Sequence, residues 1–167
     1  METIAPARLK ETVADCQARV KTATDRLAKT FEFVPDGKLK WSPSKTARSA
    51  LAIVAHCIMA NRMFAMMIRG EQISPMPTPE QAHASSRQFE ATITDRAEAV
   101  RQLEASSQEV VAAIGTMTAK RFGGSPNSPF GPMPMPVWMS LPGGHMDNHA
   151  AQIDYLQTTW GDLTDHM

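Results

Sequence analysis

The sequence predicts an all-α fold, a four-helix bundle. Apolar residues recur at the three-to-four spacing of a helical face in four long stretches, and segments rich in proline and glycine separate these stretches. No convincing strand, internal repeat or heptad array interrupts this pattern. The chain has 167 residues, a length that one compact core can organise, so we expect a single domain over residues 1–167.

The first helix is predicted over about residues 6–29. Its apolar positions fall on one face, at Leu9, Val13, Cys16, Val20, Ala23 and Leu27. A connection over residues 31–44 follows and contains the turn sequence Pro35-Asp36-Gly37. The second helix is predicted over about residues 45–69, with Ser44 as its N-cap and Gly70 as its C-cap. It is apolar over much of its circumference, which predicts burial on several sides.

The third helix is expected from residue 85 or 86 to residue 118, after a proline-rich break over residues 74–79. Its start has an alternative, because Thr78-Pro79-Glu80 could open a short extra helix. Residues 121–136 are dense in glycine and proline and predict a long loop. A last helix is predicted over about residues 143–160, with a turn at residues 137–141 before it.

Charge balance and hydropathy argue against nucleic-acid-binding, membrane and secreted proteins. Seventeen basic residues match seventeen acidic ones, and the pI is about 7.0. Because nucleic-acid-binding proteins usually carry a basic excess that neutralises phosphates, we expect no nucleic-acid partner. The sequence contains neither a secretory signal nor about 18 consecutive apolar residues, and its two cysteines lack disulfide or zinc spacing. We therefore expect a cytoplasmic protein with no membrane partner.

Three histidines form the candidate site. His145 and His149 are four residues apart on the last predicted helix, so their side chains share one face, with Gln152 three residues further on. His56 lies on the inward stripe of the second helix. Each imidazole by itself could be a hydrogen-bonded core residue. Burying three of them in one small bundle is costly unless each finds a partner, and one shared metal ion would satisfy all three.

Three nitrogen ligands would leave coordination positions for water or substrate, which is the pattern of catalytic metal sites. Imidazole suits zinc, nickel, iron and copper alike, so the ligands do not select the metal. Gln152 and Asp147 are near enough in sequence to support the ligands by hydrogen bonds. His83 is expected to be solvated and His166 frayed near the C-terminus. Cys57 lies about 100° round the helix from His56 and is expected to pack elsewhere.

Two short segments resemble the DinB-like (YfiT-like) metalloenzyme family. One is Leu39-Lys40-Trp41-Ser42-Pro43 followed by Ala47-Arg48-Ser49-Ala50 and Ile53-Val54-Ala55-His56, which is similar to that family's entrance to its second helix. The other is His145-Met146-Asp147-Asn148-His149-Ala150-Ala151-Gln152-Ile153, which is similar to its last-helix pattern. The order and spacing of the helices extend the resemblance over most of the chain.

The resemblance implies an up-down-down-up bundle with a long crossover connection, and a homodimer. It also implies one divalent metal ion, zinc or nickel, held by three histidines that match His56, His145 and His149. Related branches include transferases that use a low-molecular-weight thiol. Pro142-Gly143-Gly144 departs from the family pattern, because relatives continue the helix there, and an interruption would weaken the presentation of His145.

Three functions remain open from the sequence. The first is a metal-dependent transferase or hydrolase that acts on a small-molecule substrate, with Trp41 and the loop methionines lining its pocket or serving only as core. The second is a module that binds metal or a small ligand without turnover. The third is a structural dimer whose three histidines hold no metal.

Overall fold

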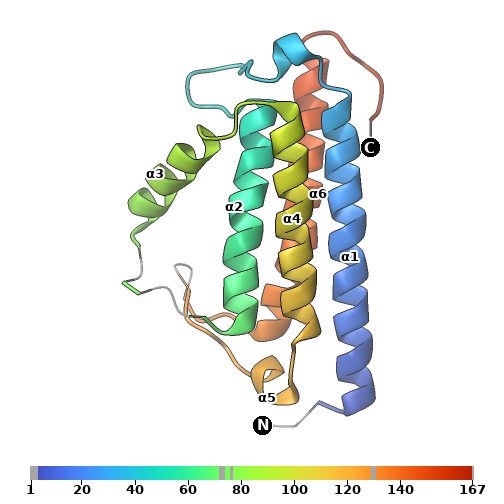
Figure 1. Cartoon of the computed structure of the whole chain (residues 1–167), viewed down its shortest axis with the longest axis vertical. Coiled ribbons are helices and arrows are strands. Elements are labelled where there is room, and N and C mark those ends of the chain that lie inside the picture. Colours follow the sequence, from blue (N-terminus) through green and yellow to red (C-terminus); the bar gives the residue numbers. More distant parts are fainter. Residues whose placement is uncertain (1–3, 72–73, 76, 129–130, 167) are drawn as a thin grey trace.

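The computed structural model describes residues 4–71, 74–75, 77–128 and 131–166, and over these residues it contains helices and no strand. Four long helices form an elongated bundle (Figure 1): α1 (Pro6–Glu32), α2 (Ala50–Arg69), α4 (Arg96–Gly115) and α6 (Met135–Thr158). Three short helices lie in the connections: η1 (Asp36–Lys38), α3 (Pro79–Glu90) and α5 (Ala119–Phe122). The predicted all-α bundle is confirmed.

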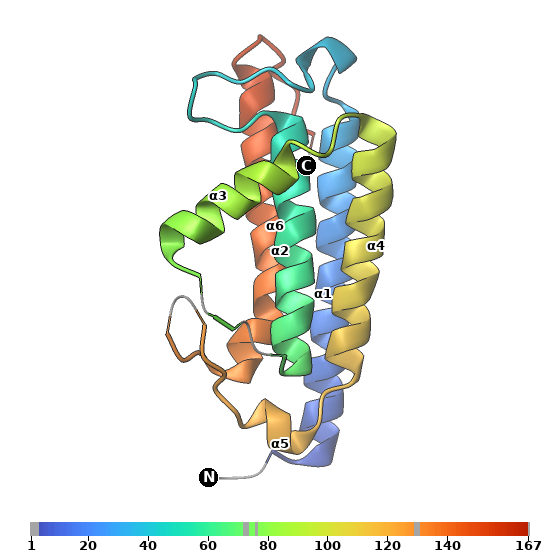
Figure 2. The ribbon, with the colours of Figure 1, turned by 60° about the vertical axis from the view of Figure 1, so that its left-hand side comes forward.

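The four long helices run up, down, down and up (Figure 1). Helix α1 packs against α4 and α6, and α2 packs against the same two, so that α1 and α2 lie diagonally opposite each other. The parallel pair α2 and α4 requires a crossover from one end of the bundle to the other. That crossover contains α3, which leans across the outer face of α2 (Figure 2). The predicted order of helices and the long crossover are therefore confirmed.

Helix α2 is the central helix of the core. Thirteen of its twenty residues are buried, among them Ile58, Ala65 and Ile68, which are fully covered. By length and composition alone α2 could cross a membrane, contrary to the expectation that no segment would reach that limit. In the bundle 67% of its most apolar window is buried, as in the core helix of a soluble protein. The apolar circumference predicted for this helix is thus used for packing.

The start of α2 was predicted five residues too early. The hydroxyl of Ser49 accepts the backbone N–H of Ala52 and is the N-cap. Ser44 instead accepts the N–H of Ala47 in the preceding segment, and the Ser42 hydroxyl donates to the carbonyl of Ala47. These local bonds hold residues 42–47 in turns and delay the helix.

The single helix predicted over residues 85–118 was wrong, because it is divided into α3 and α4. Helix α3 begins with the reciprocal capping box of Thr78 and Gln81, which was the alternative start read from the sequence. Asp95 caps α4 by accepting the N–H of Glu98. Thr92 donates its hydroxyl to the carbonyl of Phe89 and helps to end α3. The break leaves α3 free to turn away from α4 and lie on α2.

The last helix is longer than predicted. It begins at Met135 and includes Pro142, so the expected interruption before His145 was wrong. Pro142 removes one helical donor, which the helix tolerates in a buried position. A Cβ atom on Gly143 would lie 2.9 Å from Cγ of Arg19, so glycine lets α6 approach α1 closely. His145 and His149 are therefore presented by one continuous helix.

Candidate metal centre

The three predicted histidines meet in the bundle, His56 from α2 and the other two from α6. One ring nitrogen of each lies within 4.8 Å of the others. The ring centroids form a compact triangle, with 5.1 Å from His56 to His145, 5.0 Å from His56 to His149 and 4.4 Å from His145 to His149. His149 is buried and the other two are partly buried. A pair of side chains one helical turn apart thus faces a third from a neighbouring helix.

The spacing of the donor atoms fits a metal ion. The Nε2 atoms of His145 and His149 are 3.2 Å apart. Two nitrogens bound at tetrahedral angles to one zinc ion, each about 2.0–2.1 Å from it, would be about 3.3 Å apart. The observed pair is close to this separation.

His56 is oriented by a chain of hydrogen bonds that begins at a carboxylate. The Ser86 hydroxyl donates to Oε1 of Glu90 at 2.8 Å, and Nδ1 of His56 lies 3.1 Å from the same hydroxyl oxygen. The serine has one proton, and it is used on Glu90. Nδ1 of His56 must therefore carry a proton and donate it to Ser86. This fixes the tautomer of His56 that leaves Nε2 with a lone pair for a metal.

Glu90 is held by two arginines. It is 5% exposed, and its Oε1 accepts from Nε of Arg48 at 2.9 Å. Its Oε2 lies 3.3 Å from a terminal amino group of Arg87. Two guanidinium groups and a serine hydroxyl thus satisfy the oxygens of the buried carboxylate.

Sequence reasoning missed Ser86, Glu90, Arg48 and Arg87 as parts of this site. Ser86 and Glu90 are four residues apart and therefore share a face of α3. That spacing is visible in the sequence. That this face meets His56 depends on the path of the crossover, which no local pattern encodes.

Gln152 contacts the outer nitrogen of the His149 ring. That nitrogen, Nδ1, lies 2.8 Å from Oε1 of Gln152, so the ring donates to the amide oxygen. The lone pair of His149 is then on Nε2, which faces the other histidines.

His145 lacks such support. Its Nδ1 is buried and has no hydrogen-bond partner among the described residues. The Phe64 and His145 rings pack at a steep angle, with centroids 5.6 Å apart. Nε2 of His145 faces Nε2 of His149 across the 3.2 Å that one shared ion would span.

All three imidazoles are neutral at pH 7. Burial lowers the pKa of His56 to about 4, helped by the charges of Arg48, His149 and Arg87. Burial also lowers the pKa of His145 to about 3, with smaller contributions from the other two histidines and Arg48. For His149 burial again lowers the pKa, and the bond to Gln152 opposes the shift. Neutral imidazoles are the form that binds metal ions.

Two other residues predicted near the site have different contacts. The carboxylate of Asp147 lies 3.5 Å from a guanidinium nitrogen of Arg26 on α1. The Trp41 ring meets the Trp160 ring edge to face, with centroids 5.4 Å apart, and Lys38 lies over both rings. Neither of these sets of contacts includes a histidine of the cluster.

The remaining histidines and cysteines lie outside the site. His83 is exposed, as expected. The prediction that His166 is frayed was wrong, because it is buried, stacks on Phe33 and approaches Asp162 at 2.9 Å. Cys57 is fully buried, which raises the pKa of its thiol far above the ordinary value, and Cys16 is also free.

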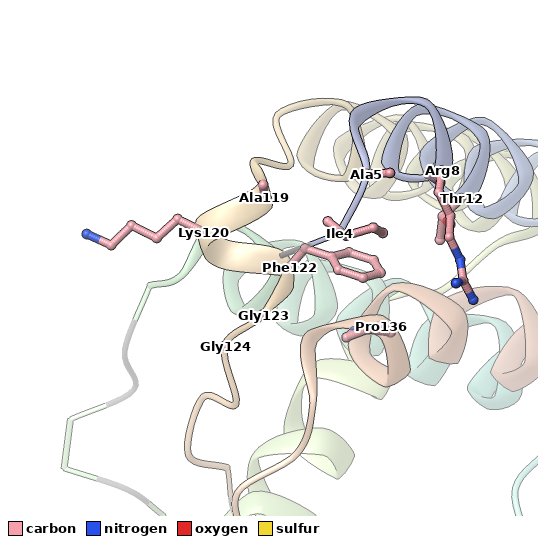
Figure 3. Close-up of a pocket in the computed structure, with 10 residues that line it drawn as sticks. All are labelled: Ile4, Ala5, Arg8, Thr12, Ala119, Lys120, Phe122, Gly123, Gly124 and Pro136. Atoms are coloured by element: carbon pink, nitrogen blue, oxygen red, sulfur yellow. The ribbon is translucent and has the colours of Figure 1, made fainter. Parts of the chain in front are cut away.

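A large cavity lies apart from the three histidines. A cavity of about 1170 Å³ is formed where the start of α1 meets α5. Figure 3 shows Arg8 and Thr12 on one side of it and Phe122 and Pro136 on the others. None of the described residues that line it is a histidine, an aspartate or a glutamate. Its lining therefore offers no metal-binding group.

Comparisons with known proteins agree with this architecture. The family model described as the DinB superfamily matches residues 6–153. The solved structure titled "Sibling Lethal Factor Precursor - DfsB" is similar with a TM-score of 0.67 and 15% identity, covering 89% of this chain and 96% of that one. The colibactin self-resistance protein ClbS, solved in complex with a dsDNA, has a TM-score of 0.67 and 14% identity, with coverages of 87% and 95%. No curated protein matches the sequence.

The expectation of no nucleic-acid partner is contradicted by the second of these structures. ClbS has this fold and is bound to dsDNA. The expectation rested on a net charge of zero, which sums over the whole surface and does not describe how charges are distributed on any one face. At 14% identity the likeness concerns the fold. The similarity therefore overturns the expectation of no nucleic-acid partner, but it does not show that this chain binds DNA.

Proposed function

This chain belongs to the DinB superfamily, and from that premise we propose that it holds one divalent metal ion through His56, His145 and His149 and acts on a small molecule there. The observation that carries the proposal is the convergence of three neutral imidazoles within 4.8 Å. Two of the three also have their second ring nitrogen held by a hydrogen bond, the usual arrangement around metal ligands. Zinc or nickel suits this donor set.

The chain's own residues would bind and orient the ion rather than attack a substrate. A divalent ion held by three nitrogens supplies a Lewis acid with coordination positions left open. Cys57, the cysteine next to His56, is buried with a raised thiol pKa and is a poor nucleophile. The nucleophile would therefore come from outside, as water or as a low-molecular-weight thiol. This favours a metal-dependent hydrolase or a thiol-dependent transferase.

A second candidate is a module that binds metal and a small ligand without turnover. It is favoured by the state of Glu90, a carboxylate 3.6 Å from His56 that already accepts from Ser86 and two arginines. The oxygens of this carboxylate are occupied by these partners, so they are not open to a substrate. Among the described residues, no other carboxylate is recorded in contact with the cluster.

Turnover that depends on the metal would separate the two candidates. The zinc-loaded protein is incubated with cysteine and 1-chloro-2,4-dinitrobenzene, so that the thiolate sulfur bonds to the ring carbon and chloride leaves, and separately with p-nitrophenyl acetate. We expect one of these reactions to stop with EDTA and to return with added zinc, and His149→Ala to lack it. Zinc binding without either reaction would favour the binding module, and equal rates with and without EDTA would contradict metal-dependent chemistry.

A further inference from the structure

A second pocket is linked to the histidine cluster through Gln152. It has a volume of about 450 Å³, within the range of small-molecule sites, and is formed between residues 46–48 and the later part of α6. Arg48, Asn148, Gln152 and Tyr155 contribute its polar groups. Gln152 connects it to the metal site, because its amide oxygen accepts from His149. A ligand in this pocket would be one side chain away from a proposed metal ligand.

We propose that this pocket binds the carboxylate of a small anionic molecule, with the guanidinium of Arg48 as its anchor. The proposal rests on the proposed metal function and adds a substrate class to it. A molecule long enough to pass Gln152 would bring its other end toward the three histidines.

The guanidinium of Arg48 is held in place with donors to spare. Its Nε donates to Glu90 at 2.9 Å, which fixes the orientation of the plane. Among the described residues its two terminal amino groups have no hydrogen-bond partner, and 24% of the side chain is exposed. A planar fork with two free amino groups matches the two oxygens of a carboxylate.

The charge around the pocket favours an anion. Arg48 is the one charged residue among the described residues that line it. Glu90 is shared with Arg87, so the three groups together keep a net positive charge. Two aspartates of this part of α6 have partners elsewhere: Asp147 pairs with Arg26, and Asp154 accepts from the backbone of His166. No acidic side chain of the described lining therefore competes for the guanidinium.

The neutral residues of the pocket suit the same ligand. Gln152 uses its amide oxygen on His149, which leaves its amide nitrogen as a donor. Tyr155 is 70% exposed and lies at the rim. The charge of Arg48 also lowers the pKa of all three histidines, which places it within electrostatic range of the whole cluster.

Arg87 distinguishes a role of Arg48 in ligand binding from a role in neutralising Glu90 alone. Arg87 binds the same carboxylate through Oε2 and also donates to the carbonyl of Thr46, yet it is absent from the lining of this pocket. If Arg48 served only to neutralise Glu90, loss of either arginine would have the same consequence. Arg87 therefore provides a matched control.

The test compares a carboxylate with its neutral amide. Zinc-loaded protein is titrated calorimetrically with 3-mercaptopropionate and with 3-mercaptopropionamide, both of which offer the metal the same thiol. We expect the wild type to bind the acid about tenfold to hundredfold more tightly, the ratio that one charge-assisted hydrogen-bonded pair provides. Arg48→Gln should remove this preference, and Arg87→Gln should keep it, at equal zinc content.

Three other outcomes would overturn the anion pocket, the role of Arg48 as its anchor, or the metal site itself. Equal affinities for the two probes in the wild type, or no binding of either, would overturn the anion pocket without any variant. A preference that survives Arg48→Gln, or that both arginine variants lose, would overturn Arg48 as the anchor. Failure of the wild type to take up zinc would overturn the proposed metal function, and the pocket's role with it.

Discussion

His56 and His145 face the same point and are held in different ways. The His56 ring is oriented by Ser86 and the buried Glu90 on α3, so its tautomer is already the one that binds metal. The His145 ring has a buried Nδ1 without a partner among the described residues and is placed by the path of α6. One ligand is thus fixed by hydrogen bonds and the other by backbone packing.

The difference assigns separate tasks to the two sides of the site. On the α3 side, folding itself orders the His56 ring through its hydrogen bond to Ser86. On the α6 side a cost remains, because a metal bound at Nε2 of His145 leaves an N–H donor at its buried, unpartnered Nδ1. Changes to the hydrogen-bond partners of the ligands should therefore act on metal affinity, and changes where α6 packs on α1 should act first on stability.

Among variants that keep the three histidines, the largest effect is expected from Ser86→Ala. It removes the acceptor of the His56 Nδ1 proton and should lower zinc affinity by about tenfold to hundredfold, as loss of such supporting groups usually does. Ser85→Ala is the matched control, since Ser85 is exposed on the same helix and should change affinity by less than about threefold. Competition with a chromogenic chelator measures both. Equal affinities for the two variants would contradict the role of Ser86.

Gly143→Ala tests the packing on the α6 side. Its new Cβ would lie 2.9 Å from Cγ of Arg19, and overpacking of this kind should lower the free energy of unfolding by about 1–3 kcal/mol. In Gly144→Ala the nearest atom is 3.8 Å away, so the gain in helix propensity should make that variant equal to wild type or about 0.5–1 kcal/mol more stable. Urea unfolding of the metal-free proteins distinguishes them. Equal stabilities would show that α6 does not depend on glycine for its approach to α1.

The metal-free protein should lose stability as the pH falls below the ordinary histidine pKa of about 6.5. The folded-state pKa values are about 4 for His56 and about 3 for His145, so the unfolded chain binds more protons in this window. The free energy of unfolding therefore falls with acidification. Thermal midpoints between about pH 7 and pH 5 should drop less steeply in His145→Gln. An identical slope in that variant would mean that His145 does not resist protonation in the folded state.

The smallest effect is expected from Asp147→Asn. Its carboxylate pairs with Arg26 on a partly exposed surface, and such pairs contribute about 0–1 kcal/mol. Zinc affinity should stay within about threefold of wild type. Gln152→Ala, which removes the acceptor for His149, should lower the affinity by about tenfold. A larger loss from Asp147→Asn than from Gln152→Ala would reverse the assignment of the two residues.

The sequence predicted the bundle because the helical period is a local signal repeated over four long segments. It failed where two local signals conflict. Residues 91–94 lie within an apolar pattern that continues a helix, but Asp95 is a strong N-cap and begins a new one. At Pro142 the sequence favoured an interruption, while packing of Gly143 on Arg19 accompanies an unbroken helix.

The candidate site could be predicted only in part for a related reason. His145, His149 and Gln152 follow one another at helical spacing, so their shared face was visible in the sequence. The link between His56 and Glu90 depends on where the crossover lays α3, which is decided by long-range packing. Asp147 is close in sequence to both histidines, yet it lies on the side of α6 that meets α1.

Metal stoichiometry tests the central claim most directly. Tag-free wild type, His56→Ala, His145→Ala and His149→Ala are incubated with zinc or nickel, desalted and measured by elemental mass spectrometry, with His83→Ala as the exposed control. We predict about one ion per chain in wild type and in His83→Ala, and its loss from the three other variants while circular dichroism shows them folded. Wild type that retains no stoichiometric ion, or an ion that survives removal of these histidines, would contradict the account.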